Sequence, residues 1–224
     1  VIFLTMEVYP VRYSPLSSTV ECADDAEISI TFENRQQSTF NNVRDLLIIA
    51  PSEFEDALQP LIEHKINYGI TTMFASTEII YQSSDGRDEA EKVKYFIKDS
   101  VENLGVKYVL LVGGREGQRL NSWYVPVRYS HLDDNSSWEA SYTSDLYYAD
   151  LYKYEDGKPV FDDWDSNGNG IFAEWNINKE DILDLHPDVY VGRLPCRYKF
   201  EVETMVDKII TYETSTYGKN WFKK

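Results

Sequence analysis

The feature that most constrains the fold is a short apolar run near the middle of the chain, residues 107–114, Lys-Tyr-Val-Leu-Leu-Val-Gly-Gly. A strand with one face in water alternates polar and apolar residues, and this run does not. Apolar side chains on both faces are typical of a parallel strand that is covered by helices on either side. Residues 45–50, Asp-Leu-Leu-Ile-Ile-Ala, have the same character. We therefore expect two buried parallel strands at the centre of a sheet.

Helical and weaker strand patterns surround these two runs. Apolar residues at helical spacing predict helices at 54–69, 88–104 and 200–212, and further strands are expected at 71–76 and 188–194. Ser52 and Glu55 resemble a capping box before the first helix, and Pro60 interrupts it.

The second helix is the clearest of the three. It carries one apolar stripe, ends at Gly105, and has Glu and Lys residues on its other face, which we interpret as solvated. The alternation of strands and helices predicts an α/β fold, a three-layer sandwich with a mainly parallel four-stranded sheet.

The N-terminal residues differ from the rest. Residues 28–32, Ile-Ser-Ile-Thr-Phe, alternate with period two, as a half-exposed strand does. We expect residues 1–40 to be a β-rich segment, the tail of a preceding domain. The α/β unit is expected over 41–217, and residues 218–224 are expected to be an end made by truncation or processing.

Composition excludes several classes of partner. The net charge of −16 argues against nucleic acid or an anionic membrane surface, and it is compatible with bound cations. No apolar run approaches the ~18 residues of a membrane helix, so no membrane insertion is expected. Two cysteines, Cys22 and Cys196, lie far apart; whether they pair stays open.

The sharpest motif is a twelve-residue acidic segment, residues 163–174, Asp-Trp-Asp-Ser-Asn-Gly-Asn-Gly-Ile-Phe-Ala-Glu. Ca²⁺ takes six to eight oxygen ligands, and calcium loops supply them from alternate positions with a glycine at position 6 and a glutamate at position 12. Gly168 stands at position 6, whereas Gly170 replaces the usual aliphatic residue at position 8. The flanks do not read as two helices, so we expect a calcium loop outside a full EF-hand. The predicted ligands are Asp163, Asp165, Asn167, Asn169 (through its carbonyl) and Glu174. The alternative is an acidic turn that binds nothing.

Nucleophilic catalysis needs a base beside the nucleophile. Of the three histidines, His64 is expected to be exposed on the first helix, and His186 precedes the last strand. A dyad of Cys196 and His131 is one hypothesis, and a small residue at a strand end is the other. No nucleophile elbow, phosphate loop or dinucleotide fingerprint occurs in the sequence, which disfavours a flavodoxin-like cofactor binder.

The order and spacing of several segments resemble the gingipain-type cysteine peptidases. The segments are 45–50, 54–69, 108–113, Ser144-Asp-Leu-Tyr147, and Val189-Tyr-Val-Gly-Arg-Leu-Pro-Cys196 leading into a helix. The resemblance implies a caspase-like fold of two α/β subdomains, of which this chain is similar to the N-terminal one. Residues 1–34 resemble the end of the family's β-rich prodomain. The family's catalytic histidine lies in a Gly-His-Gly segment of the second subdomain, which this chain lacks, so the resemblance assigns no catalytic residue here. Calcium-stabilised loops are common in that family, which agrees with the predicted calcium loop at residues 163–174.

These observations together predict the non-catalytic N-terminal part of a calcium-binding, gingipain-like cysteine endopeptidase, located extracellularly or at the cell surface. Its expected partners are the remainder of the peptidase and a protein or peptide substrate. Because the family often cleaves after basic residues, self-processing is expected after Lys224. The alternative is a non-proteolytic, calcium-dependent extracellular binding or scaffold domain.

Overall fold

The computed structural model describes residues 11–14, 19–22, 43–116, 122–131, 142–176 and 179–216. The chain divides into two compact units, Val1–Thr39 and Phe40–Lys224. In the smaller unit, β1 (Val11–Ser14) and β2 (Thr19–Cys22) pair antiparallel. The strand predicted at 28–32 and the C-terminal segment 218–224 lie outside the described residues.

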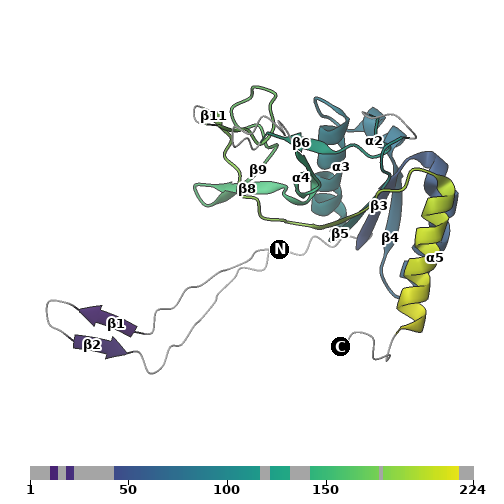
Figure 1. Cartoon of the computed structure of the whole chain (residues 1–224), viewed down its shortest axis with the longest axis horizontal. Coiled ribbons are helices and arrows are strands. Elements are labelled where there is room, and N and C mark those ends of the chain that lie inside the picture. Colours follow the sequence, from purple (N-terminus) through teal and green to yellow (C-terminus); the bar gives the residue numbers. More distant parts are fainter. Residues whose placement is uncertain are drawn as a thin grey trace. The chain divides into compact units, whose positions relative to one another are not determined.

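The larger unit is built on a four-stranded parallel sheet, as the apolar runs predict (Figure 1). Its strands are β3 (Leu46–Ala50), β4 (Thr72–Ser76), β5 (Tyr108–Val112) and β12 (Tyr190–Leu194). Their spatial order is β12-β5-β3-β4. Every residue of β3 is buried, which explains why its sequence does not alternate. The predicted α/β fold with a parallel four-stranded sheet is confirmed.

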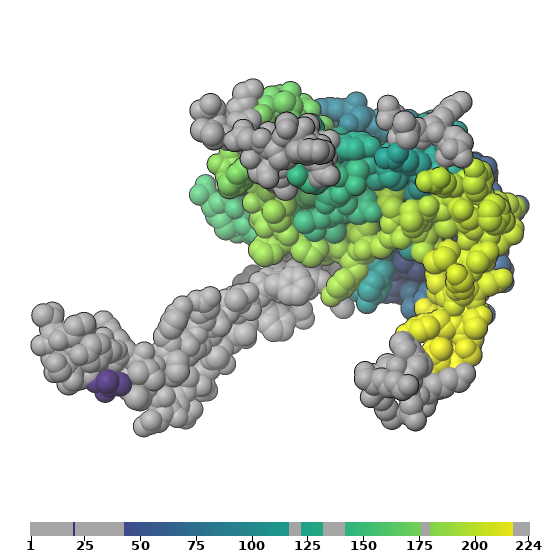
Figure 2. Space-filling model, in the orientation of Figure 1, coloured from purple at the N-terminus to yellow at the C-terminus, as the bar shows by residue number. Residues whose placement is uncertain are grey.

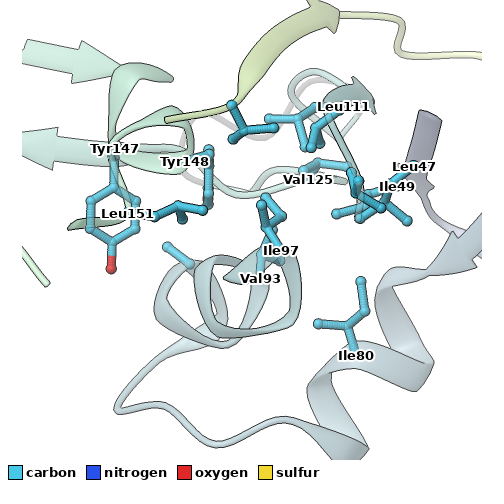
Figure 3. Close-up of a cluster of buried hydrophobic side chains, with 14 of the residues drawn as sticks. Leu47, Ile49, Ile80, Val93, Ile97, Leu111, Val125, Tyr147, Tyr148 and Leu151 are labelled. Carbon is cyan, nitrogen blue, oxygen red and sulfur yellow. The ribbon is translucent and has the colours of Figure 1, made fainter. Parts of the chain in front are cut away.

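Helices cover both faces of this sheet. On one face, α1 (Glu55–Asn67) and α5 (Lys199–Ser215) pack against the sheet residues Ile48 and Val112. Leu58 of α1 belongs to the same apolar cluster. On the other face, α2 (Thr77–Ser83), α3 (Glu89–Leu104) and α4 (Leu146–Ala149) contribute to the second cluster. Figure 3 shows that cluster, with Leu47, Ile49 and Leu111 from the sheet facing Val93 and Ile97 from α3.

The aromatic segment between β5 and β12 forms short hairpins. Strand β6 (Arg128–Ser130) pairs with β7 (Tyr142–Ser144), β8 (Tyr152–Glu155) with β9 (Lys158–Phe161), and β10 (Trp175–Asn176) with β11 (Lys179–Glu180). All three pairs are antiparallel. They lie on the side of the larger unit that holds α3 and α4 (Figure 1).

The start of α1 differs from the prediction. The capping box at Ser52 is wrong: residues Ser52–Phe54 form a 3₁₀ turn, α1 begins at Glu55, and the Ser52 hydroxyl donates to Glu78 at 3.0 Å. A glutamate that follows β4 therefore takes the hydroxyl that the local pattern assigned to the helix.

The boundaries of α3 agree with the sequence. The Asp88 side chain accepts a hydrogen bond from the Glu91 amide at 2.8 Å, and Gly105 ends the helix with φ +72°. The solvated interpretation of its polar face is wrong for two residues. Glu91 and Lys94 are buried, because Arg87 and a layer of aromatic side chains cover them.

Within the ranges given above, no helix has the length and apolar character that a membrane span requires.

Candidate functional site

The carboxyl ends of β5 and of its neighbour β12, an edge strand, meet at a tight junction between two loops, which we call the glycine junction. The Gly113 amide donates to the Leu194 carbonyl at 2.9 Å, and the Gly114 amide donates to the Cys196 carbonyl at 2.7 Å. A Cβ placed on Gly114 would lie 2.4 Å from the carbonyl oxygen of Pro195. The second glycine of the central run is therefore needed for a close backbone approach between the segments that follow β5 and β12.

Replacing Gly114 by alanine is expected to lower the free energy of unfolding by about 1–3 kcal/mol, because the backbone of Pro195 must move away. Gly192 is the matched control, since a Cβ there meets nothing within 4 Å. Urea denaturation of Gly114→Ala and Gly192→Ala measures both. Equal stability of the two variants would contradict the close approach.

Arg193, on β12, hydrogen-bonds both to the loop that follows β5 and to Asp145, just before α4. Its guanidinium donates to the Asp145 carboxylate through Nε at 2.7 Å and Nη2 at 2.8 Å. Its remaining N–H groups donate to the carbonyls of Gly113, Val125 and Pro126 at 2.8–3.0 Å. All five donors of the side chain are thus used, so Arg193 holds the loop after β5 in place.

Cys196 is buried beneath α5, on the α1 and α5 face of the sheet, and is a free thiol. Burial raises the pKa of this thiol, and the nearby charge of Glu201 raises it further. His131 instead lines a cleft with Ala90 and Phe172, which belong to the opposite side. The hypothesis of a Cys196–His131 dyad is therefore wrong, because the sheet separates the two side chains.

The other histidines lie elsewhere. His64 is buried, contrary to expectation, because its Nε2 lies 2.8 Å from the Glu213 carboxylate of α5. His186 is exposed. Neither is placed at the glycine junction.

A cleft of about 550 Å³ lies at the N-terminus of α3. Arg128 forms its charged floor, donating to both carboxylate oxygens of Asp88 at 2.8 Å while its guanidinium stacks 3.6 Å from the Phe172 ring centroid. Burial alone would raise the pKa of Asp88, but the hydrogen bonds from Arg128 and the Glu91 amide outweigh it and lower that pKa. The cleft is therefore lined by the ion pair of Arg128 with Asp88 and by aromatic side chains, among them Phe172.

The acidic loop at 163–174 adopts the turn that its glycine predicts. Gly168 has φ +70°, and the Asp165 Oδ1 and Asn167 Oδ1 atoms both accept from the Asn169 amide, at 2.9 and 3.1 Å. The Asn169 side chain donates to Glu174 at 2.6 Å, which brings the twelfth position of the loop to the seventh. Hydrogen bonds to Asn169 therefore gather the side-chain oxygens of Asp165, Asn167 and Glu174 at one end of the loop, with Asp165 and Glu174 buried.

A residue outside the motif occupies part of this site. The Arg87 guanidinium pairs with Asp165, with Asp163 at 2.8 Å and with Glu91 at 2.7 Å. Among the described residues, no group of three or more His, Cys, Asp or Glu side chains is arranged as a metal site. The donor types and the turn fit Ca²⁺, whereas Arg87 supplies the positive charge that Ca²⁺ would otherwise bring. Calcium at Asp163, Asp165, Asn167, Asn169 and Glu174 stays a prediction.

Asp181, which follows the loop in the sequence, accepts hydrogen bonds from three loop residues. Its carboxylate accepts from the Glu174 amide at 2.8 Å, the Ser166 hydroxyl at 3.1 Å and the Asn167 amide at 3.3 Å. Sequence reasoning missed Arg87, which lies 76 residues before Asp163 and is brought to the loop only by the fold. Asp181 stands out in the sequence only as one of several acidic residues near the motif.

A buried charged layer lies beneath the loop. Lys94 is fully buried with its Nζ 4.2 Å from the Tyr147 ring centroid, and Asp150 accepts from the Trp164 indole at 2.9 Å. Burial lowers the pKa of Lys94, which the charges of Asp150 and Asp162 oppose. Burial raises the pKa of Asp150. The loop thus rests on a lysine enclosed by aromatic rings rather than on a purely apolar floor.

Comparison with known proteins gives one family and a few structures. The model of peptidase family C25 matches residues 40–224. Among solved structures, dimeric latent PorU from Porphyromonas gingivalis has a TM-score of 0.55 at 18% identity, with 82% of this chain and 17% of that one covered. The complex of Porphyromonas gingivalis RgpB pro- and mature domains has a TM-score of 0.47 at 20% identity, with 75% and 29% covered. The chain thus spans less than a third of the length of either structure. No curated protein matches it.

Proposed function

Because the chain belongs to peptidase family C25, the gingipain family, we propose that it is the N-terminal, non-catalytic part of a gingipain-like cysteine endopeptidase. The observation that carries the proposal is the placement of Cys196. The thiol is buried, its pKa is raised, and the sheet separates it from His131. A nucleophilic cysteine needs the opposite, a lowered pKa and an adjacent base. The catalytic dyad is then supplied by a second α/β subdomain.

In this proposal, the chain's own residues position that second subdomain. The glycine junction and Arg193 fix the loops at the carboxyl edge of the sheet, where function collects in parallel α/β folds. The substrate is a protein or peptide, and the location is extracellular or at the cell surface.

The test of the non-catalytic role uses the longer gene product that contains these residues. We expect the Cys196→Ser variant to keep peptidase activity on a casein or peptide substrate, within about a factor of two of the wild type. Complete loss of activity with an unchanged melting temperature would assign the nucleophile to Cys196 and overturn the proposal. A longer protein without Gly-His-Gly and a later strand-end cysteine would favour the scaffold alternative instead.

We further propose that the loop at 163–174 holds a structural Ca²⁺ ion through the five predicted ligands. Support comes from the φ of Gly168 and from the inward position of Glu174, which is buried although it carries charge. When bound, the ion would pin the long excursion between β5 and β12, and Arg87 would share or release Asp163 and Asp165.

Calcium is expected to stabilise the chain by about 2.7 kcal/mol at a free concentration one hundred times its dissociation constant. Thermal melting in a calcium titration and in excess chelator measures this. The Glu174→Gln variant is expected to lose the dependence, whereas Glu180→Gln, at an exposed position just beyond the loop, keeps it. A wild-type melting temperature that excess chelator and added calcium leave unmoved would contradict the site.

A further inference from the structure

The cleft at the N-terminus of α3 contains polar atoms that the rest of the chain leaves unpaired. Among the described residues, three buried nitrogen atoms of its lining side chains have no hydrogen-bond partner: Trp123 Nε1, Arg128 Nε and His131 Nδ1. Buried polar atoms without a partner destabilise a fold, and they are rare in folded proteins. The indole and guanidinium N–H groups can only donate, so the cleft calls for an acceptor that the chain itself does not supply.

The side chains that carry these atoms are held in place. Arg128 is 5% exposed, and both of its Nη atoms donate to Asp88 at 2.8 Å, which leaves Nε as the unpaired donor. Trp123 forms a backbone bridge with Arg115, whose guanidinium lies 5.4 Å from its ring centroid. The backbone N–H and C=O groups of His131 are both hydrogen-bonded. The cleft is therefore a preformed site, as ligand sites usually are.

The charges around the cleft favour an uncharged acceptor. Asp88 balances the charge of the Arg128 guanidinium, and Glu89 adds a second carboxylate to the lining. Two carboxylates beside one guanidinium leave no excess of positive charge, so a carboxylate or phosphate group of a ligand would be repelled. A carbonyl oxygen accepts hydrogen bonds without carrying a charge, and it is therefore the acceptor that fits.

The cleft runs along the edge of β6. The consecutive residues 126–129 all line it, whereas successive side chains of a strand point to opposite faces, so the cleft lies at the strand's edge rather than on one face. Among the described residues, β6 pairs with β7 and with no other strand. In an antiparallel pair, alternate residues turn their N–H and C=O groups away from the partner, so β6 can take a further strand. Figure 1 shows β6 beside α3, and Figure 2 shows this part of the chain, in teal, at the surface of the larger unit.

We propose that this cleft binds an extended peptide segment of another protein, which adds to β6 as a strand and places carbonyl oxygens against Trp123 and Arg128. An extended peptide presents a carbonyl group at every residue, and strand addition to an open edge is a common mode of peptide recognition. The rings of Tyr129 and Phe172 give its side chains an apolar wall, and the volume of about 550 Å³ lies in the range of ligand sites. Binding of this kind goes beyond the proposed function and is independent of where the catalytic dyad lies.

Nuclear magnetic resonance of the isotope-labelled chain tests the cleft. The probe is the capped peptide acetyl-Thr-Val-Gln-Val-Thr-amide, whose β-branched residues favour an extended backbone. We expect the side-chain N–H resonances of Trp123 and Arg128 to shift and to reach saturation as the peptide is added. The indole resonance of Trp164, which already donates to Asp150 at 2.9 Å, is expected to stay in place.

Two matched variants show whether the unpaired indole takes part in binding. Trp123→Phe keeps an aromatic ring but removes the N–H group, so it is expected to weaken peptide binding by about two- to ten-fold. Trp175→Phe changes an exposed residue outside the cleft lining and is expected to leave the affinity unchanged. Melting temperatures of both variants check that they fold. Equal affinities of the wild type and Trp123→Phe would contradict the role of the indole.

A control peptide tests the strand addition. Proline in place of the central glutamine removes the N–H group that a new strand needs, and it is expected to weaken binding by about ten-fold. An unchanged affinity of the proline peptide would contradict pairing with β6.

Three other results would overturn the proposal. Cleft resonances that the peptide leaves unmoved mean that water alone satisfies the three nitrogen atoms. Overhauser contacts in the free protein between the Trp123 indole N–H and the backbone of another segment mean that this chain itself fills the cleft. Saturable shifts with maltotriose or with acetate, but not with the peptide, assign the cleft to a carbohydrate or to an anion.

Discussion

Replacing Leu111 by alanine is expected to lower the free energy of unfolding by about 2–5 kcal/mol. Leu111 lies in β5, between β3 and β12, and its side chain is completely buried in the cluster shared with α3. Its removal takes away buried apolar surface and leaves a cavity, because rigid strands on both sides prevent the site from collapsing.

Urea denaturation at 25 °C measures the loss, with Ile66→Ala as the control. Ile66 is on α1 and is half exposed, so its truncation is expected to change stability by no more than about 0.5 kcal/mol. If Leu111→Ala cost no more than Ile66→Ala, the central position of β5 in the core would be wrong.

Replacing Asp88 by alanine is expected to cost about 1–3 kcal/mol, because the buried guanidinium of Arg128 loses its counter-charge, while water in the cleft replaces part of the half-exposed carboxylate. Arg128 is 5% exposed, and the rings of Phe172 and Tyr147 lie over it, with centroids at 3.6 and 4.5 Å. Asp88 also caps α3, so part of the loss comes from the helix start.

Two further variants separate these contributions. Asp88→Asn can still cap the helix but carries no charge, so it isolates the ion pair. The double variant Asp88→Ala with Arg128→Met removes both charges and is expected to recover part of the loss seen for Asp88→Ala. If the double variant lost more unfolding free energy than the two single variants lose in total, the pairing of Asp88 with Arg128 would be contradicted.

The same ion pair predicts a direction for acid unfolding. The pKa of Asp88 is lower in the folded chain than its ordinary value of 3.8. Its contribution to stability is therefore complete above that value and is lost as the pH falls through the lowered folded pKa. Asp88→Asn is expected to flatten this part of the stability profile, which urea titrations between pH 5 and pH 2 measure.

What the sequence by itself determined is the part of the fold that follows from neighbours along the chain. The apolar runs at 46–50 and 108–112 predict strands buried on both faces, and Asp88 and Gly105 delimit α3, because burial periodicity and capping are local properties. The turn at Gly168 is likewise fixed by the spacing of short oxygen-bearing side chains.

Only the tertiary structure decided which charged side chains pair with each other and which strand residues are exposed. Arg87 meets Asp163, Arg128 meets Asp88 and Arg193 meets Asp145, each across 40 or more residues of sequence. Pairings of this kind depend on which loops the topology brings to one edge of the sheet, and no local pattern encodes them. The exposure of Tyr108 and Tyr190 has the same origin, since no helix among the described residues covers that part of the sheet.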